Sequence, residues 1–338
     1  MISGARSRGS ITNPPTGAGT GGDGAEFRAH ELELPAGLAG LRLDAALAKV
    51  LPQYSRARLQ GWIRAGAVTV DGRVPRTRDP VRGEEVVRIR GHLAPFGKVA
   101  ADAMALEVIY RDAGLMVINK PAGLVVHPGA GNARNTLQNG LLAFEPALER
   151  VPRAGIVHRL DKDTSGLLVV ARTPEAHTAL VAALAARQIR RGYVALCTGV
   201  MTGGGTVDQP IGRHRSLRTR MTVRADGRAA VTHFRILERL RAHTLVSVEL
   251  ETGRTHQIRV HLAHLGYPLV GDPLYGGRRR LPAGASAAVL AELAGFKRQA
   301  LHAARLGLRH PASGAELDFE VPVPADFAAL LAALAADK

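Results

Sequence analysis

The segment His158-Arg-Leu-Asp-Lys-Asp-Thr-Ser-Gly166 is the densest polar cluster of the chain. It lies between Gly155-Ile156-Val157 and the apolar run Leu167-Leu168-Val169-Val170, which has the pattern of a buried strand. Loops held by rigid elements often carry catalytic and binding residues. The residues alone leave two interpretations open. One is a turn with Asx-type hydrogen bonds, and the other is a loop in which a carboxylate acts as nucleophile or base among cations.

The sequence around this loop predicts a sheet with a few helices. Strand-like segments are expected at residues 106–110, 116–119, 167–171, 193–200, 231–237 and 244–250. Helical patterns cover residues 175–188 and 256–265, and in the second Thr255 is expected to be the N-cap. Strands in runs with few helices predict an α+β domain with a mixed, mainly antiparallel sheet flanked by helices, over residues 106–332.

A smaller unit is expected at residues 31–92. Its first helix follows Leu41 and stops at Pro52, and a second begins after Ser55, a good N-cap. Valines then alternate into Asp71-Gly72, which is typical of a two-residue hairpin. The expectation is two helices on a small sheet. Between Leu41 and Arg90 there are 11 Lys/Arg against 5 Asp/Glu, so the unit is basic.

Length and composition limit the functional classes. A chain of 338 residues is expected to form two domains, with a disordered tail at residues 1–26 and a linker at 93–105. The formal charge of +16 favours a polyanionic partner, although a proteome rich in Arg and Ala would also give basic chains. The single cysteine, Cys197, excludes an internal disulfide framework. No apolar run reaches the length of a membrane span and no signal segment is visible, so a cytoplasmic location is expected.

The small unit resembles the RNA-binding domain named after a protein of the small ribosomal subunit, the S-four-like domain. The resemblance is carried by Arg42-Leu43-Asp44, Ser55-Arg56 and the run from Gly66 to Gly72. It implies contacts with RNA through four arginines of this unit: Arg42, Arg56, Arg58 and Arg64. The alternative is that these arginines form a solvated helix face.

The larger unit resembles the pseudouridine synthases that include the enzymes of large-subunit ribosomal RNA. Every fixed position of their motif H-R-L-D-x-x-T-S-G is present from His158 to Gly166. Further matching segments follow one another in order: Asn119–Pro128, Arg191-Gly192-Tyr193, Thr252–His261, Gly271–Gly276 and Gln299–Ala303. The arrangement with an appended small domain is similar to the D-type layout of that family. The resemblance implies the pseudouridine synthase fold and the isomerisation of uridines in RNA.

The resemblance also implies roles for four residues. Asp161 corresponds to the catalytic aspartate, and Tyr193 to the tyrosine expected to stack on the extruded base. Arg254 corresponds to the basic residue that pairs with this aspartate. Arg159 corresponds to a position expected to fill the space left by the flipped nucleotide, although it could equally brace a phosphate. Neither cofactor nor metal is expected, because the base is both leaving group and returning nucleophile.

Three alternatives stay open at this point. The substrate is expected to be 23S ribosomal RNA or the pre-ribosomal large subunit, with transfer RNA or dual specificity as the alternative. A non-catalytic RNA-binding protein for ribosome assembly would use the same fold. A hydrolase using Asp161 with Asp163 is disfavoured, because such enzymes place two carboxylates across the scissile bond. The basic loop 213–220 could contact RNA phosphates, with solvated surface charge as the alternative. Arg278-Arg279-Arg280 has no assigned role, and a monomer is expected.

Overall fold

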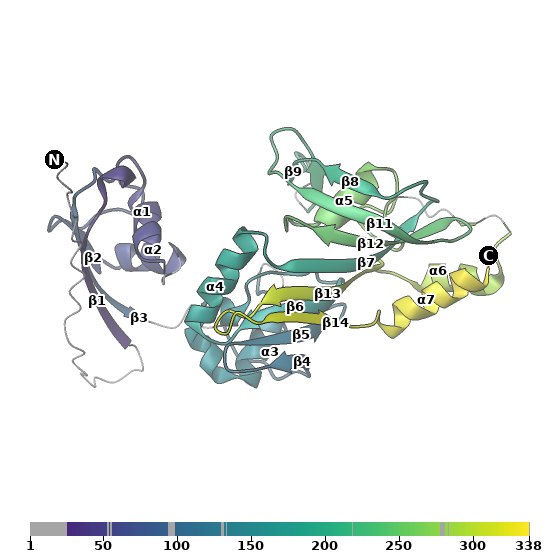
Figure 1. Ribbon diagram of the computed structural model, residues 1–338, viewed down its shortest axis with the longest axis horizontal. Helices are drawn as coiled ribbons and strands as arrows, with labels where there is room; N and C mark the ends of the chain where they lie inside the picture. Colours follow the sequence, from purple (N-terminus) through teal and green to yellow (C-terminus); the bar gives the residue numbers. More distant parts are fainter. Residues whose placement is uncertain are drawn as a thin grey trace, which may run out of the picture.

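A computed structural model describes residues 26–337, apart from residues 53, 55, 94–98, 130, 131, 133, 218, 278–280 and 283. The described residues leave out four predicted features: residues 1–25 of the tail, residues 94–98 of the linker, the expected cap Ser55, and the Arg278–Arg280 segment. Figure 1 shows a small domain at one end of the long axis and a larger domain that forms the rest.

The small domain has a three-stranded antiparallel sheet in the order β1-β3-β2, with two helices packed on it. Its elements are β1 (Glu26–Glu33), η1 (Ala36–Leu38), α1 (Leu43–Val50), α2 (Arg56–Arg64), β2 (Val68–Val70) and β3 (Val86–Leu93). The sheet thus starts at Glu26, before the expected boundary at residue 31. The hairpin at Asp71-Gly72 forms as expected: both residues have positive φ, and Val70 and Arg73 exchange backbone hydrogen bonds.

Asp44 lies at the centre of the small domain with no exposed surface. Its carboxylate accepts hydrogen bonds from Arg42 (2.9 Å from Nη2), Arg56 (3.0 Å from Nη2) and Gln60 (2.5 Å from Nε2). Burial alone would raise the pKa of Asp44, but these donors hold the pKa well below its usual range. The carboxylate therefore joins the start of α1 to α2.

We expect Asp44→Asn to lower the free energy of unfolding of the small domain by about 2–3 kcal/mol at pH 7, because charge-assisted bonds are lost. Because the folded pKa is depressed, the contribution is present above about pH 4 and is lost as the pH falls further. Urea unfolding at pH 7 and pH 3 measures this. An equal effect of the substitution at both pH values would contradict the ion-pair account.

The large domain is built on a nine-stranded sheet with the order β4-β5-β6-β13-β7-β12-β11-β8, with β14 beside β13. Among the described strands of this sheet, only β13 and β6 pair in parallel, and every other pair is antiparallel. The strands are β4 (Glu107–Arg111), β5 (Leu115–Lys120), β6 (Ser165–Ala171), β7 (Arg190–Thr198), β8 (Gly205–Asp208), β11 (Val231–Arg239), β12 (His243–Leu250), β13 (Leu301–Arg309) and β14 (Glu316–Glu320). The predicted α+β class with a mixed, mainly antiparallel sheet is confirmed.

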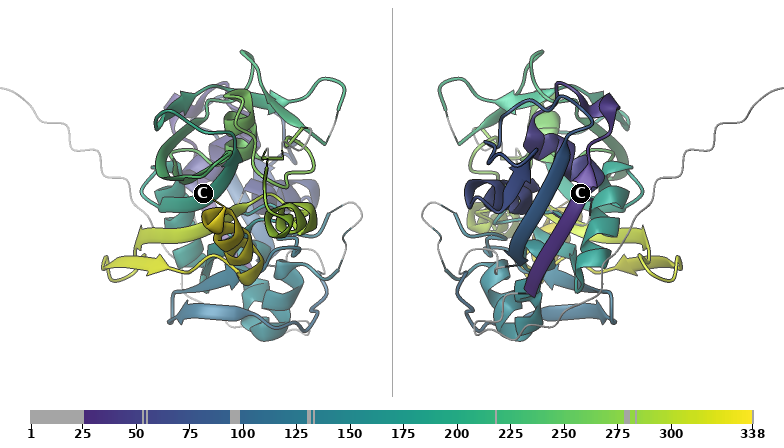
Figure 2. Two further views of the ribbon diagram at one scale, coloured as in Figure 1. Left: turned by 90° about the vertical axis from the view of Figure 1, so that its right-hand side faces the viewer. Right: turned by 90° about the vertical axis from the view of Figure 1, so that its left-hand side faces the viewer.

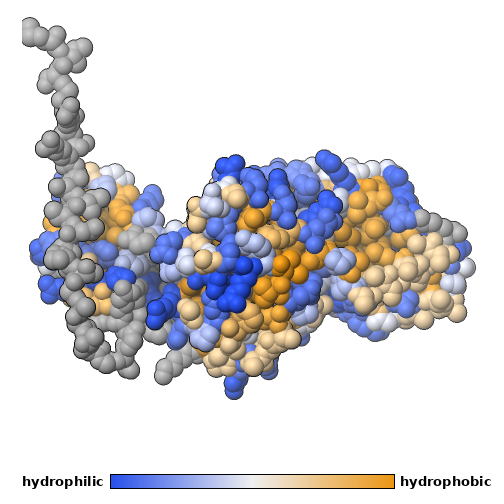
Figure 3. Space-filling view, turned by 60° about the horizontal axis from the view of Figure 1, so that its bottom comes forward, coloured by the Kyte–Doolittle hydropathy of each residue, from blue (hydrophilic) through white to orange (hydrophobic). Residues whose placement is uncertain are grey.

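Helices and a two-stranded ribbon complete this domain. The helices are α3 (Leu137–Phe144), η2 (Pro146–Arg150), η3 (Pro152–Gly155), α4 (Pro174–Ala185), α5 (Gln257–His264), α6 (Ala287–Gly295) and α7 (Ala325–Ala336). The ribbon pairs β9 (Ile211–Arg213) with β10 (Met221–Val223). Helices α6 and α7 lie side by side (Figure 2). Their alanine-rich surfaces form the pale orange end of the space-filling view in Figure 3.

Strand β7 separates two cores of the large domain. Tyr193, Ala195 and Cys197 pack into the larger apolar cluster, whereas Val194 and Leu196 pack into the cluster of α6 and α7. This alternation is the period of a strand buried on both faces. Among the described residues, no helix is both long and apolar enough to cross a membrane.

Candidate active site

The loop that carries Asp161 is anchored at both ends by glycines. Gly155 has φ +80°, and a Cβ there would lie 1.8 Å from the Ala171 carbonyl oxygen. Gly166 has φ +115°, and a Cβ there would lie 2.3 Å from the Ala303 oxygen. Both positions therefore require glycine. The following strand, β6, is buried along its whole length, so the loop projects from a rigid base.

The buried side chain of Lys120 fixes the same loop through hydrogen bonds to backbone carbonyl oxygens. Its Nζ donates hydrogen bonds to the carbonyl oxygens of Pro121 (2.7 Å), Leu124 (2.9 Å) and Lys162 (3.0 Å). Burial lowers the pKa of Lys120 to about 7, and the negative charges of Asp163 and Asp161 partly oppose this shift. The end of β5 and the Asp161 loop are thus joined through one side chain.

The carboxylate of Asp161 is paired with Arg259, which lies on α5. Arg259 Nη1 donates to Asp161 Oδ2 at 2.9 Å, while its Nε and Nη2 donate to the two oxygens of Asp272 at 2.7 and 2.9 Å. Asp272 is fully buried, and the Arg259 side chain is only 4 % exposed. Burial alone would lower the pKa of Arg259, but the two carboxylates hold it above its usual range. Asp272 therefore fixes the guanidinium that fixes Asp161.

The expected pairing of Arg254 with Asp161 is not what the structure shows. Arg254 Nε donates to the Ala229 carbonyl oxygen at 3.0 Å, and its guanidinium lines the cavity without an ion pair to Asp161. The expected N-cap is also different, because His256, with φ +57°, occupies this position and α5 begins at Gln257. The Gln257 side-chain oxygen accepts a hydrogen bond from the backbone N–H of Arg254. Arg254 precedes this left-handed residue and Arg259 follows it, and the two arginines have different partners.

His256 is a further residue beside Asp161 that the sequence did not identify as part of the site. Its Nε2 lies 3.9 Å from Asp161 Oδ1, and its Nδ1 is 2.8 Å from the Tyr275 hydroxyl oxygen. Burial lowers the pKa of His256, with the negative charge of Asp161 opposing the shift. A left-handed conformation is unusual for a non-glycine residue, and such positions cluster at functional sites. The positive φ angle of His256 identifies it as a site residue, and no local sequence pattern predicts that angle.

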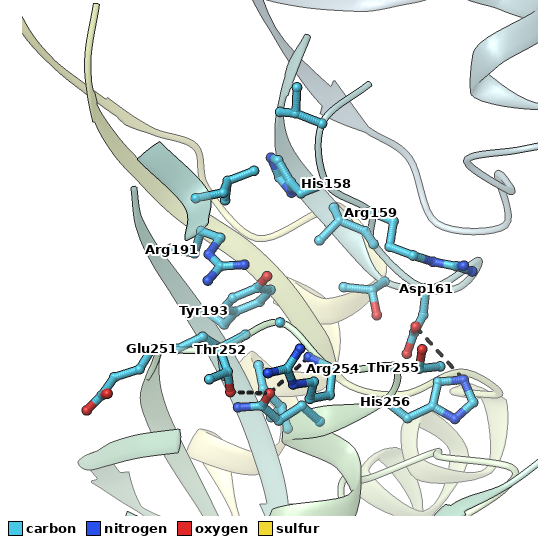
Figure 4. A pocket seen from close by; sticks show the side chains of 18 of the residues that line it. His158, Arg159, Asp161, Arg191, Tyr193, Glu251, Thr252, Arg254, Thr255 and His256 are labelled. Atoms are coloured by element: carbon cyan, nitrogen blue, oxygen red, sulfur yellow. Dashed lines mark hydrogen bonds and ion pairs between the residues drawn. The ribbon is translucent and has the colours of Figure 1, made fainter. Parts of the chain in front are cut away.

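These side chains surround a cavity of about 480 Å³. Figure 4 shows Tyr193 and Arg254 on one side of it and Asp161 and His256 on the other. The Asp161 side chain is 18 % exposed, so the cavity gives access to the carboxylate. Tyr193 is buried, which raises the pKa of its hydroxyl. Arg159 is exposed at the cavity wall. The structure thus brings Asp161, Tyr193, Arg254 and Arg159 to one cavity.

The four arginines expected to contact RNA have different environments in the small domain. Arg42 and Arg56 are about half exposed, with side-chain exposures of 45 % and 50 %, and each also binds Asp44. Burial lowers the pKa of Arg58, whereas Arg64 is exposed at the end of α2. In the described part of the chain, no cluster of three or more His, Cys, Asp or Glu residues has a geometry that would hold a metal ion.

Comparisons with known proteins identify both domains. Residues 114–264 match the family model described as RNA pseudouridylate synthase, and residues 41–87 match the S4 domain. The chain is 54 % identical to the ribosomal large subunit pseudouridine synthase D of Xanthomonas campestris, covering 90 % of this chain and 92 % of that protein. The protein of the same name from Escherichia coli K12 is 51 % identical, with coverages of 88 % and 92 %.

Solved structures give the same result at lower identity. The human RNA pseudouridylate synthase domain containing 4 is 29 % identical with a TM-score of 0.54, covering 68 % of this chain and 93 % of that chain. The human RNA pseudouridylate synthase domain containing 1 is 27 % identical with a TM-score of 0.50, covering 65 % and 84 %. The likeness to both structures covers about two thirds of this chain.

Proposed function

The chain belongs to the RNA pseudouridylate synthase family, and we propose that it converts specific uridines of large-subunit ribosomal RNA to pseudouridine. The relatives at 51–54 % identity carry the name of this activity and cover nearly the whole chain. The single structural observation that carries the proposal is a carboxylate, Asp161, held by Arg259 and facing an open cavity beside Tyr193. The expectations of a cytoplasmic location and of a monomer remain predictions.

The proposed chemistry starts at the Asp161 carboxylate. It either attacks C1′ of the target ribose, which forms a glycosyl ester, or takes the C2′ proton, which forms a glycal. In both routes the N1–C1′ bond breaks, the uracil turns, and C5 bonds to C1′. The carboxylate is then released or returns its proton, and the C5 proton leaves. Arg259 offsets the negative charge of Asp161 and fixes its rotamer, so the nucleophile or base is preorganised.

Around this centre the other cavity residues bind the everted nucleotide. The buried ring of Tyr193 provides a surface on which a uracil stacks. Arg159 is exposed and has no hydrogen-bond or ion-pair partner among the described residues, so it is free to occupy the space that the nucleotide vacates in the RNA. The S4 domain adds affinity for RNA through Arg42, Arg56, Arg58 and Arg64, whose contacts with phosphate do not depend on sequence.

We expect Tyr193→Phe to keep the stacking surface and to retain kcat/KM within about fivefold, whereas Tyr193→Ala lowers it about 10- to 100-fold. Single-turnover assays on a fragment of ribosomal RNA measure both variants, and thermal unfolding shows whether each is folded. If the Phe variant were as slow as the Ala variant, the hydroxyl group rather than the ring face would be required.

The substrate is tested by mapping carbodiimide-stopped reverse transcription on ribosomal and transfer RNA from cells with and without this chain. The proposal expects stops in large-subunit ribosomal RNA that vanish on deletion and return with the wild-type chain. Stops lost only in transfer RNA would establish the alternative substrate. Unchanged stops together with defective ribosome assembly would favour a non-catalytic RNA-binding role.

A further inference from the structure

Arg191 shares the active-site wall with Tyr193. Both residues lie on β7, two positions apart, and side chains at i and i+2 of a strand point to the same face. Both line the cavity, and Figure 4 shows them on one side with Asp161 across from them. The rise of a strand separates their Cα atoms by about 7 Å. A base stacked on Tyr193 therefore lies within reach of the Arg191 guanidinium.

The Arg191 guanidinium has no partner in the part of the chain that the structure describes. Among the described residues nothing accepts a hydrogen bond from it or pairs with it, and its Nε is buried. Gly253 leaves room for it, because a Cβ at that position would lie 2.7 Å from Arg191 Nη1. The Arg191 side chain is partly buried, and a polar atom that is buried without a hydrogen-bond partner is costly, so such atoms are normally compensated. The missing acceptor is expected to arrive with the substrate.

The carboxylates of the cavity are already engaged. Asp161 binds Arg259, and Glu251 binds Arg187 and, at 2.8 Å, His233. Burial lowers the pKa of His158 to about 3, and the positive charge of Arg191 adds to this shift. Among the described residues no carboxylate pairs with Arg191, so its charge on the Tyr193 side of the cavity faces Asp161 without a contact of its own.

This arrangement matches the charge that the proposed reaction creates, and the inference rests on that proposed function. We propose that Arg191 is a catalytic residue that donates a hydrogen bond to a uracil carbonyl oxygen and stabilises the base as a leaving group. When the N1–C1′ bond breaks, its electron pair remains on the uracil and delocalises onto O2 and O4. A fixed hydrogen-bond donor aimed at these oxygens stabilises the uracil anion more than it stabilises the neutral uridine, so it lowers the barrier to cleavage.

The symmetry of uracil lets one guanidinium serve both halves of the reaction. Rotation of the ring about the N3–C6 axis exchanges N1 with C5 and O2 with O4. The oxygen that faces Arg191 during cleavage is therefore replaced by the other oxygen when C5 attacks C1′. The electron pair then forms the C5–C1′ bond, the C5 proton passes to water, and no proton is taken from Arg191.

The test compares Arg191→Gln with Arg190→Gln under single turnover. Arg190 is the matched control, because it is the adjacent residue on β7, its side chain is 67 % exposed, and it pairs with Asp318 at 2.9 Å. We expect Arg191→Gln to lower kcat about 100- to 1000-fold with little change in KM, the usual effect of removing one donor to a developing anion. Arg190→Gln is expected to stay within about twofold of the wild type.

Substrates with 2-thiouridine or 4-thiouridine at the target identify the acceptor, since sulfur accepts hydrogen bonds weakly. We expect each to slow the wild type and Arg190→Gln, but to add no further loss to Arg191→Gln, and we expect Arg191→Lys to recover part of kcat. Equal thio effects in wild type and Arg191→Gln would overturn the proposal. So would a defect confined to KM with a flatter salt dependence of kcat/KM, which indicates a phosphate contact. If the wild type makes no pseudouridine, the proposed function fails instead.

Discussion

Asp161→Asn is expected to bind RNA as tightly as the wild type, within about twofold, and to form pseudouridine at least about 10⁴-fold more slowly. The amide has nearly the shape of the carboxylate, and its oxygen still accepts from Arg259 at the position where Oδ2 lies 2.9 Å from Nη1. An amide is neither a nucleophile for C1′ nor a base for the C2′ proton. The substitution therefore removes the chemistry and keeps the site. Single-turnover conversion and a filter-binding isotherm on the same RNA measure the two quantities.

Asp163→Asn provides the matched control, because it removes the same charge from the same loop. Among the described residues the Asp163 carboxylate accepts no hydrogen bond, and it does not line the cavity, so its loss is expected to change kcat less than about threefold. Residual activity of Asp161→Asn above one hundredth of the wild-type rate would refute the assigned role. An equal loss in both variants would show that the charge of the loop matters rather than this one carboxylate.

Local sequence patterns predicted much of the secondary structure around the site. The apolar run after Gly166 became the buried strand β6, and the valines before Asp71-Gly72 formed one arm of the hairpin. These features depend on neighbouring residues, so periodicity and turn chemistry are enough to find them. The pairing of β13 with β6 is different. It places His302 beside Ser165, and no local pattern encodes a contact between segments so far apart.

The choice between Arg254 and Arg259 shows where sequence reasoning failed at the site. Both arginines lie in one motif, and both line the cavity. Arg259 pairs with Asp161, and it follows His256, whose positive φ lies at the start of α5, one residue later than expected. Non-glycine residues rarely adopt that conformation, so a pattern of residue types does not predict it. A buried arginine also needs a carboxylate to compensate its charge. Asp272, in the later Gly-Asp-Pro segment, pairs with Arg259, and it is the sequence feature that could have identified Arg259 as the buried arginine of the site.

The pairing of Arg259 with two carboxylates leads to the second large effect, which falls on stability as well as on activity. Arg259→Met leaves Asp272 as a buried, uncompensated carboxylate with no exposed side-chain surface. We expect the free energy of unfolding to fall by about 3–5 kcal/mol and conversion to become at least about 100-fold slower. Thermal and urea unfolding, together with single-turnover assays, measure the two losses.

Adding Asp272→Asn to Arg259→Met separates these two losses. The asparagine removes the buried charge, while its oxygen still accepts from the backbone N–H groups of Leu274 and Tyr275, as Oδ1 of Asp272 does at 2.9 and 3.1 Å. Most of the lost stability is therefore expected to return. Activity is expected to stay low, because Asp161 still lacks the guanidinium that fixes it. If the double variant regained activity together with stability, Arg259 would act only by keeping the domain folded, and Asp161 would need no partner to react.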